Sequence, residues 1–161
     1  MLYSSIELPA SFQADFTQMI TNTKQKVIRY SGKVIFSDKK FFKWMYLSPT
    51  KKEVCTDGIE LLIVDHDLEQ VSAYYMAKGL DISKVLSNAK LYKEHIYVAE
   101  YEGKKYTIQL NDKGQLQSIA YYDELDNKVQ IVFENIEYAK SILDRKKLQC
   151  NYPEAYDVIR G

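Results

Sequence analysis

The chain has 161 residues, which is enough for one domain with a sizeable core. Lysine plus arginine equals aspartate plus glutamate, 22 each, which excludes a global field that would favour nucleic acid or a membrane surface. No apolar run reaches the length of a membrane span, and residues 1–5 lack the basic and apolar regions of a signal peptide. We therefore expect either a cytoplasmic protein or the mature form of an exported one.

The N-terminal segment predicts an amphipathic helix over about residues 9–23. The sequence from Leu8 to Ser11 is typical of a helix entry, and Phe12, Phe16, Met19 and Ile20 recur at i, i+4, i+7 and i+8. From residue 26 the apolar period changes to two. That pattern, with intervening turn residues such as Asp57-Gly58, predicts strands over residues 27–36, 40–47, 51–56, 59–65 and 68–75.

Residues 77–90 interrupt the strand pattern, because their apolar residues have near-helical spacing and predict one or two short helices. Strands are predicted again over 94–101, 104–110, 115–122 and 127–138, with a last short strand at 147–150 and an extended tail. The expected fold is mainly β (α+β). It is a single domain over residues 1–161, with about 10–11 antiparallel strands curled into a barrel or half-barrel and helices on its open side.

The sequence offers little support for an enzyme. It contains no nucleophile elbow, phosphate loop, dinucleotide fingerprint or zinc-type cysteine spacing, so we expect no catalytic residue, no cofactor and no metal site. Asp65-His66-Asp67 fits a polar hairpin turn better than a metal or acid–base cluster, and His95 fits a surface or half-buried position. The run from Asp144 to Lys147 is most simply a solvated turn. Basic and aromatic residues do not cluster on one element, so we expect no nucleic-acid partner.

The two cysteines, Cys55 and Cys150, leave two interpretations open. They could pair in an oxidising compartment, or they could be two small buried hydrophobic residues.

The segment from Phe41 to Tyr46 places a lysine among bulky aromatic residues in a predicted strand. Side chains alternate along a strand, so Phe42, Trp44 and Tyr46 share one face and Lys43 belongs to the other. The pattern fits a concave apolar site with one placed charge, or an ordinary core strand along which Lys43 lays its aliphatic stem. The 14 tyrosines of the chain suit strands that line an amphiphilic cavity.

Several segments, taken in order, carry a resemblance to a known family. They are Ser11 to Gln18, Ser31 to Val34, Phe42-Lys43-Trp44 followed by Pro49, Asp57-Gly58 with Asp65 and Val71, and Pro153 with Asp157-Val158-Ile159. Over nearly its whole length the chain resembles the periplasmic outer-membrane lipoprotein carrier protein LolA family. The order and spacing of these segments carry the likeness more than any single motif.

The resemblance implies an unclosed, strongly curved antiparallel β-barrel whose helices form a lid over an apolar cavity for acyl chains. The partners it implies are acylated lipoproteins, an inner-membrane lipoprotein-releasing ABC transporter and an outer-membrane acceptor, with the carrier a monomer in the periplasm. Where the family has arginine in Phe-Arg-Trp, this chain has Lys43. The resemblance therefore suggests Lys43 as a lid latch, weaker than arginine because lysine lacks the planar five-donor fork.

The resulting candidate residues fall into two groups. The predicted cavity lining is Phe36, Phe42, Trp44, Tyr46, Leu62, Val64, Tyr75, Ile108, Leu116, Ile119, Tyr121, Ile131 and Phe133. The predicted lid residues are Phe16, Met19, Ile20, Leu80, Val85 and Leu86. A register slip of one residue would reverse a whole strand face, and Lys43 and Trp44 should not both face the cavity. The alternatives are a LolB-like acceptor or lipid-sensing domain of the same fold, or a non-carrier interaction domain whose barrel is filled by side chains.

Overall fold

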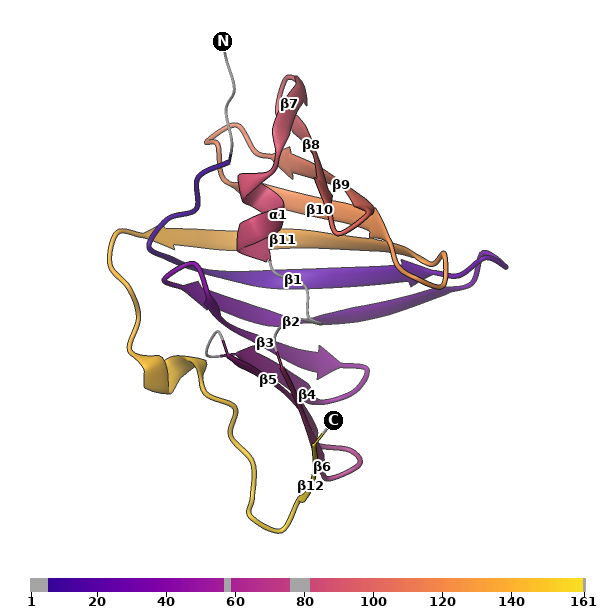
Figure 1. The fold of residues 1–161 in the computed structure, drawn as a ribbon, viewed down its shortest axis with the longest axis vertical. Helices are drawn as coiled ribbons and strands as arrows, with labels where there is room; N and C mark the ends of the chain where they lie inside the picture. The colour runs from indigo at the N-terminus through magenta and orange to yellow at the C-terminus, as the bar shows by residue number, and fades with distance from the viewer. Residues whose placement is uncertain (1–5, 57–58, 76–81, 161) are drawn as a thin grey trace.

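The computed structural model describes residues 6–56, 59–75 and 82–160, except for the side chain of Tyr75 (Figure 1). In these residues one α-helix, α1 (Ile82–Ser87), and one 3-10 helix, η2 (Arg145–Leu148), accompany twelve strands. The strands are β1 (Ser11–Thr21), β2 (Val27–Ser37), β3 (Phe41–Ser48), β4 (Lys52–Thr56), β5 (Glu60–Asp65), β6 (Gln70–Tyr75), β7 (Lys90–Lys93), β8 (Ile96–Tyr101), β9 (Lys104–Leu110), β10 (Leu116–Tyr122), β11 (Lys128–Ala139) and β12 (Asp157–Arg160). No helix in the described part of the chain is long and apolar enough to cross a membrane.

All twelve strands belong to one sheet in the order β12-β6-β5-β4-β3-β2-β1-β11-β10-β9-β8-β7. Neighbours are antiparallel except for β12, which pairs in parallel with β6. The sheet starts at β12 and ends at β7 without closing on itself, and it curves strongly across Figure 1. The predicted fold class, a mainly β protein with an unclosed, curved sheet and a short central helix, is confirmed.

The predicted N-terminal helix over residues 9–23 is wrong, because this segment is strand β1 in the middle of the sheet. Phe12, Phe16 and Ile20 are four residues apart, and an even spacing puts them on one face of a strand as well as of a helix. Only Met19 distinguishes the two periods: it falls on the opposite face of β1, where it is half-buried. The apolar stripe was thus compatible with both structures, and pairing with β2 and β11 selects the strand.

The C-terminal prediction is also partly wrong. Residues 147–150 were predicted as a strand, but η2 occupies Arg145–Leu148, where the Asp144 side chain caps it by accepting a hydrogen bond from the Lys146 N–H. The extended tail is confirmed and forms the edge strand β12. β7 follows α1 directly and was not predicted. The Asp57-Gly58 turn lies outside the described residues.

The two faces of the sheet have different covers. Helix α1 packs on one face, here called the inner face, with Ile82, Val85 and Leu86 in the main apolar core (Figure 1). The segment 140–156, here called the C-terminal strap, crosses the other face, the outer face. The strap accepts a hydrogen bond from the Ser11 hydroxyl on β1 and makes further hydrogen bonds to side chains of β2 and β4. It then leads into β12 beside β6.

Strands β2 and β3 approach unusually closely at Gly32. A Cβ atom there would lie 1.8 Å from the Met45 carbonyl oxygen, next to a register shift between Ser31 and Gly32. Only glycine therefore allows the backbones of β2 and β3 to approach this closely beside the aromatic residues of β3.

Candidate functional site

An aromatic wall lines the inner face at the centre of the sheet. The register aligns Phe36 with Phe42 and Val34 with Trp44, so Phe42, Trp44 and Tyr46 share that face as the alternation predicts. The Phe16 ring packs edge-on against Trp44 and Tyr46, with ring centroids 4.9 and 5.1 Å apart. These contacts join β1 and β3 across β2, where Gly32 leaves room for them.

A small cavity opens beside this wall. It has a volume of about 170 Å³ and is lined by Gln18, Phe42, Trp44, Tyr46, Val54, Leu61, Tyr121 and Ile131. The Tyr46 hydroxyl donates to Gln18 Oε1 at 2.9 Å, so both polar groups have a partner. Burial raises the pKa of both Tyr46 and Tyr121 to about 12. The lining is thus apolar with neutral tyrosine hydroxyls, which suits an aliphatic ligand better than a charged one.

Helix α1 packs against the inner face with its apolar side. Ile82, Val85 and Leu86 are all buried within the core cluster, as is Ala89 just beyond the helix. Val85 and Leu86 were predicted lid residues, and Ile82 was missed although it belongs to the same helical spacing. Leu80 lies outside the described residues. A helix of six residues has little stability of its own, so its apolar contacts with the sheet hold it in place.

The other three predicted lid residues do not belong to a helix. Phe16, Met19 and Ile20 lie on β1, within the sheet itself. Phe16 belongs to the inner-face core and Ile20 packs against it, whereas Met19 faces outward, where its sulfur lies 3.6 Å from the Arg29 guanidinium.

The predicted cavity residues divide by strand face. Those in the buried inner-face core are Phe36, Phe42, Trp44, Ile108, Leu116, Ile119, Ile131 and Phe133, and the half-buried Tyr46 and Tyr121 pack against them. Leu62 and Val64 belong to the outer face, because the unshifted register aligns Leu62 with Cys55 and Val64 with Glu53. Tyr75 lies on β6 opposite Glu60. Assigning Leu62 and Val64 to the inner face was a one-residue parity error of the kind that a continuous apolar strand invites.

Lys43 lies on the outer face, so its predicted role as a latch for a lid over the inner face is wrong. Its Nζ donates to the Gln149 carbonyl at 2.8 Å and pairs with Glu53 Oε1 at 3.1 Å. The residue is only 6% exposed. Lys43 therefore fastens the C-terminal strap, while the neighbouring Trp44 lies in the inner-face core, as alternation along β3 requires.

Glu53 connects Lys43 to a second group. Its Oε2 lies 2.6 Å from His66 Nε2, and His66 Nδ1 lies 2.9 Å from the Tyr156 hydroxyl on the strap. Burial alone would raise the pKa of Glu53, but hydrogen bonds from His66, Lys43 and the Asn151 N–H outweigh burial and hold that pKa below its ordinary value. The network ties the strap to β3, β4 and the turn after β5.

The acidic neighbours of His66 serve the turn. Asp65 accepts a hydrogen bond from the Leu68 N–H, and Asp67 accepts one from the Lys51 N–H. No group of three or more histidine, cysteine, aspartate or glutamate side chains is placed to hold a metal ion within the described ranges. His95, with a positive φ at the start of β8, lies near Glu94 and Asp112 on the surface.

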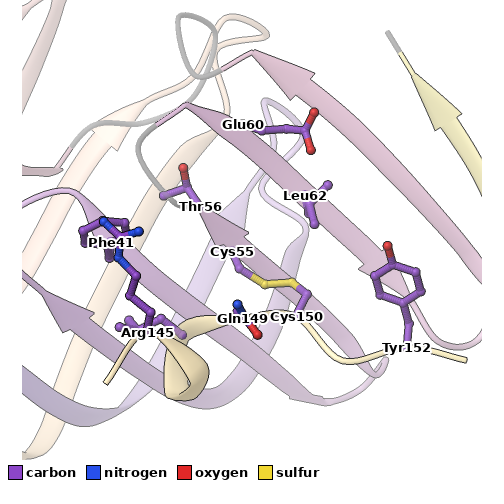
Figure 2. Close-up of a pocket in the computed structure, with 10 residues that line it drawn as sticks. Phe41, Cys55, Thr56, Glu60, Leu62, Arg145, Gln149, Cys150 and Tyr152 are labelled. Carbon is purple, nitrogen blue, oxygen red and sulfur yellow. A yellow bond between two sulfur atoms is a disulfide. The ribbon is translucent and has the colours of Figure 1, made fainter. Parts of the chain in front are cut away.

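The cysteines are paired, which decides the question that the sequence left open. The Cys55–Cys150 disulfide joins β4 to the strap and lines an outer-face pocket of about 360 Å³, shown in Figure 2. Phe41 and Arg145 flank one side of this pocket, with the guanidinium 4.8 Å from the ring centroid, and Tyr152 lies at the other (Figure 2). The strap as a structural element was missed in the sequence, although Cys150 beyond the last long strand and the outward parity of Lys43 both pointed to it.

Comparisons with known proteins agree with this architecture. Residues 9–95 match the family model described as outer membrane lipoprotein carrier protein LolA. The chain is 33% identical to the outer-membrane lipoprotein carrier protein of Campylobacter jejuni, over 93% of this chain and 86% of that protein. It is 31% identical to the protein of the same description from Wolinella succinogenes, over 83% and 78% of the two chains.

Two solved structures have a similar fold at low sequence identity. One is an uncharacterised conserved protein from Thermus thermophilus, with a TM-score of 0.61 and 12% identity over 96% of this chain and 92% of that one. The other is a LolA superfamily protein from Nitrosomonas europaea, with a TM-score of 0.52 and 9% identity over 91% and 93%. At such identities the likeness concerns the fold alone.

Proposed function

The chain belongs to the LolA family of outer membrane lipoprotein carrier proteins, and on this premise we propose that it binds the acyl chains of lipoproteins on the inner face. The observation that carries the proposal is the aromatic wall around Phe16 and Trp44, which leads into an apolar cavity and shares one apolar core with the short helix α1. No charged side chain lines that cavity among the described residues. The role is that of a chaperone and not of an enzyme.

The size of the cavity supports a carrier that opens to take its cargo. At about 170 Å³ it is smaller than the ~300–1,000 Å³ of typical ligand pockets, so side chains fill most of the inner face in this state. Displacement of α1 would uncover the positions that Ile82, Val85 and Leu86 now occupy. We propose that acyl chains take their place, so that binding and release follow an equilibrium between open and closed states.

The energetics of that exchange explain how a carrier can release what it binds. Each buried CH₂ group contributes about 0.8 kcal/mol, so even part of an acyl chain supplies several kcal/mol. The three apolar residues of α1 regain a similar environment when the chain leaves. The net affinity is the difference between the two burials, and it stays moderate.

The compartment and partners follow from the same premise. The Cys55–Cys150 disulfide supports an oxidising location, since disulfides are rare in the cytosol. We propose a periplasmic monomer that accepts lipoproteins from an inner-membrane ABC transporter and passes them to an acceptor at the outer membrane.

Neighbouring residues on β5 offer a matched test of the inner face. Leu61 lines the inner cavity and Leu62 lines the outer pocket, and both are half-buried. A triacylated lipopeptide should displace a bound hydrophobic fluorescent probe from the wild-type protein. Leu61→Gln should weaken that binding severalfold, whereas Leu62→Gln should leave it unchanged.

A wild-type protein that ignores the lipopeptide would refute the carrier function and favour a domain whose sheet is filled by side chains. Equal losses in both variants would refute the inner face as the binding site. Co-purification of acylated lipoprotein released from spheroplasts then tests the transport role directly.

A further inference from the structure

The β1–β2 hairpin projects beyond the strands on either side of it. β3 pairs with β2 only from Ser31 onward, and β11 begins at Lys128, opposite Thr21. Residues 22–29, here called the hairpin tip, therefore extend past the sheet, as the long indigo-purple hairpin in Figure 1 shows. A large flat partner that approaches this end of the strands would meet the hairpin tip before the rest of the sheet.

The tip has a fixed shape. Asn22 Oδ1 accepts hydrogen bonds from the N–H groups of Lys24 and Lys26 at 2.9 and 3.0 Å, and the Asn22 N–H donates to the Lys26 carbonyl at 2.9 Å. Gln25 takes a positive φ of 66° to complete the turn. The side chains at the tip are thus presented on an ordered turn, which lowers the entropic cost of binding through them.

The surface of the tip combines cations with exposed apolar side chains. Lys24, Lys26 and Arg29 are exposed, and Val27 and Ile28 between them are 55% and 52% exposed. The sequence has no acidic residue from position 16 to position 37. Since the whole chain has no net charge, this cationic surface is local. Basic residues around exposed aliphatic side chains fit the headgroups and upper acyl region of an anionic bilayer.

The adjacent β10–β11 turn contributes an exposed apolar side chain and acidic charge. It presents Leu125, which is 78% exposed, together with three carboxylates. Asp123 accepts hydrogen bonds from the Leu125 and Asn127 N–H groups, and Glu124 lies 3.7 Å from the Lys104 ammonium. The acidic charge on this turn is thereby partly compensated, and Asp126 remains as its other carboxylate.

An apolar row connects the tip to the inner cavity. Ile28 pairs with Ile20, which packs against the inner-face core. One step further along, Tyr30 pairs with Gln18, which lines the cavity. An acyl chain that leaves a bilayer at the tip would follow these residues into the cavity without crossing a charged side chain of the row.

We propose that the hairpin tip is a docking surface for an anionic lipid bilayer, and that it brings this end of the inner face against the membrane. The cations bind the headgroups and Val27 and Ile28 enter the interface. The docking itself needs only the bare tip. The suggested path for an acyl chain rests on the proposed carrier function.

The test uses flotation of the cargo-free protein with vesicles of phosphatidylethanolamine and phosphatidylglycerol, against vesicles of phosphatidylcholine alone. Wild type should float with the anionic vesicles, less so at high salt because screening weakens the headgroup contacts. Lys24→Glu/Lys26→Glu should lower the partition coefficient roughly twenty-five-fold or more, at about fivefold for each lysine lost. Val27→Ser/Ile28→Ser should lower it at unchanged salt dependence.

Lys39→Glu/Lys113→Glu is the matched control, because both lysines are exposed on turns at the opposite end of the strands. It should float like wild type. Equal losses in the control and the tip variants, or no flotation of the folded wild type, would overturn the proposal. Lipopeptide binding in solution, measured without vesicles, should survive in the tip variants. If the protein binds lipopeptide in solution but the wild type does not float with vesicles, the docking proposal is refuted and the carrier function stands.

Discussion

Replacing Lys43 with methionine should destabilise the protein by about 2–3 kcal/mol at neutral pH. The substitution keeps an unbranched aliphatic stem but removes the ammonium that bonds to the Gln149 carbonyl and Glu53. Removing one partner of a buried ion pair costs about 3–5 kcal/mol. The cost is reduced here because Glu53 keeps His66 and the Asn151 N–H as partners. For a chain of this length the expected fall in melting temperature is roughly 4–12 °C.

The loss should depend on pH in one direction. The folded-state pKa of Glu53 is lowered, so the ionised carboxylate adds stability above its unfolded pKa, and this is lost as pH falls through the folded value. Without Lys43 the pKa of Glu53 should rise toward its ordinary range. The difference between wild type and Lys43→Met should therefore be full at neutral pH and shrink below about pH 4.

Urea denaturation at neutral pH and below about pH 4 measures this difference. Unfolding is followed through the fluorescence of Trp44, the single tryptophan. Lys33→Met is the matched control, because Lys33 pairs with Asp15 at the same kind of distance, 2.9 Å, but with 60% of its side chain exposed. The control should cost much less than Lys43→Met, because solvent screens an exposed ion pair. If both variants lose the same stability, or if the loss in Lys43→Met does not depend on pH, the strap is not held by this ion pair.

Three further predictions concern other parts of the fold. Replacing Cys55 and Cys150 with serine should cost about 2–5 kcal/mol in urea denaturation; a variant as stable as the oxidised wild type would show that the strap needs no crosslink. Gly32→Ala should cost more than about 3 kcal/mol or prevent folding, because its Cβ would overlap a β3 carbonyl oxygen; a soluble variant with an unchanged melting temperature would contradict that close approach. Phe16→Ala should cost about 3–5 kcal/mol and Met19→Ala clearly less, since only Phe16 is in the inner-face core. Equal losses would instead favour the helical stripe that β1 replaces.

Much of the fold was predictable because local signals agreed with tertiary pairing. The period-two pattern from residue 27 onward and the turn residues between the runs gave strands β2 to β6 and β8 to β11 close to their observed bounds. The spacing of Ile82, Val85 and Leu86 gave helix α1. At Phe12, Phe16 and Ile20 the same reasoning failed, because a spacing of four fits both secondary structures.

The candidate site was predictable in part. Most of the expected cavity residues lie in the inner-face core, since alternation fixes which residues of a strand share a face. Leu62 and Val64 were misassigned because β5 is apolar on both faces, and its sequence does not reveal which face meets α1. The C-terminal strap lies over the outer face of the sheet, which is why β5 carries apolar residues on that face too.

By itself the sequence determined strands β2 to β6 and β8 to β11, the short helix α1 and the opposite facing of Lys43 and Trp44, because these depend on local periodicity. Only the tertiary structure decided which side each of them meets. The C-terminal strap returns to β3 and β4 from about a hundred residues further along the chain. A contact of that range leaves no periodic trace, so the partner of Lys43 became known only when the disulfide and the Gln149 carbonyl were placed beside it.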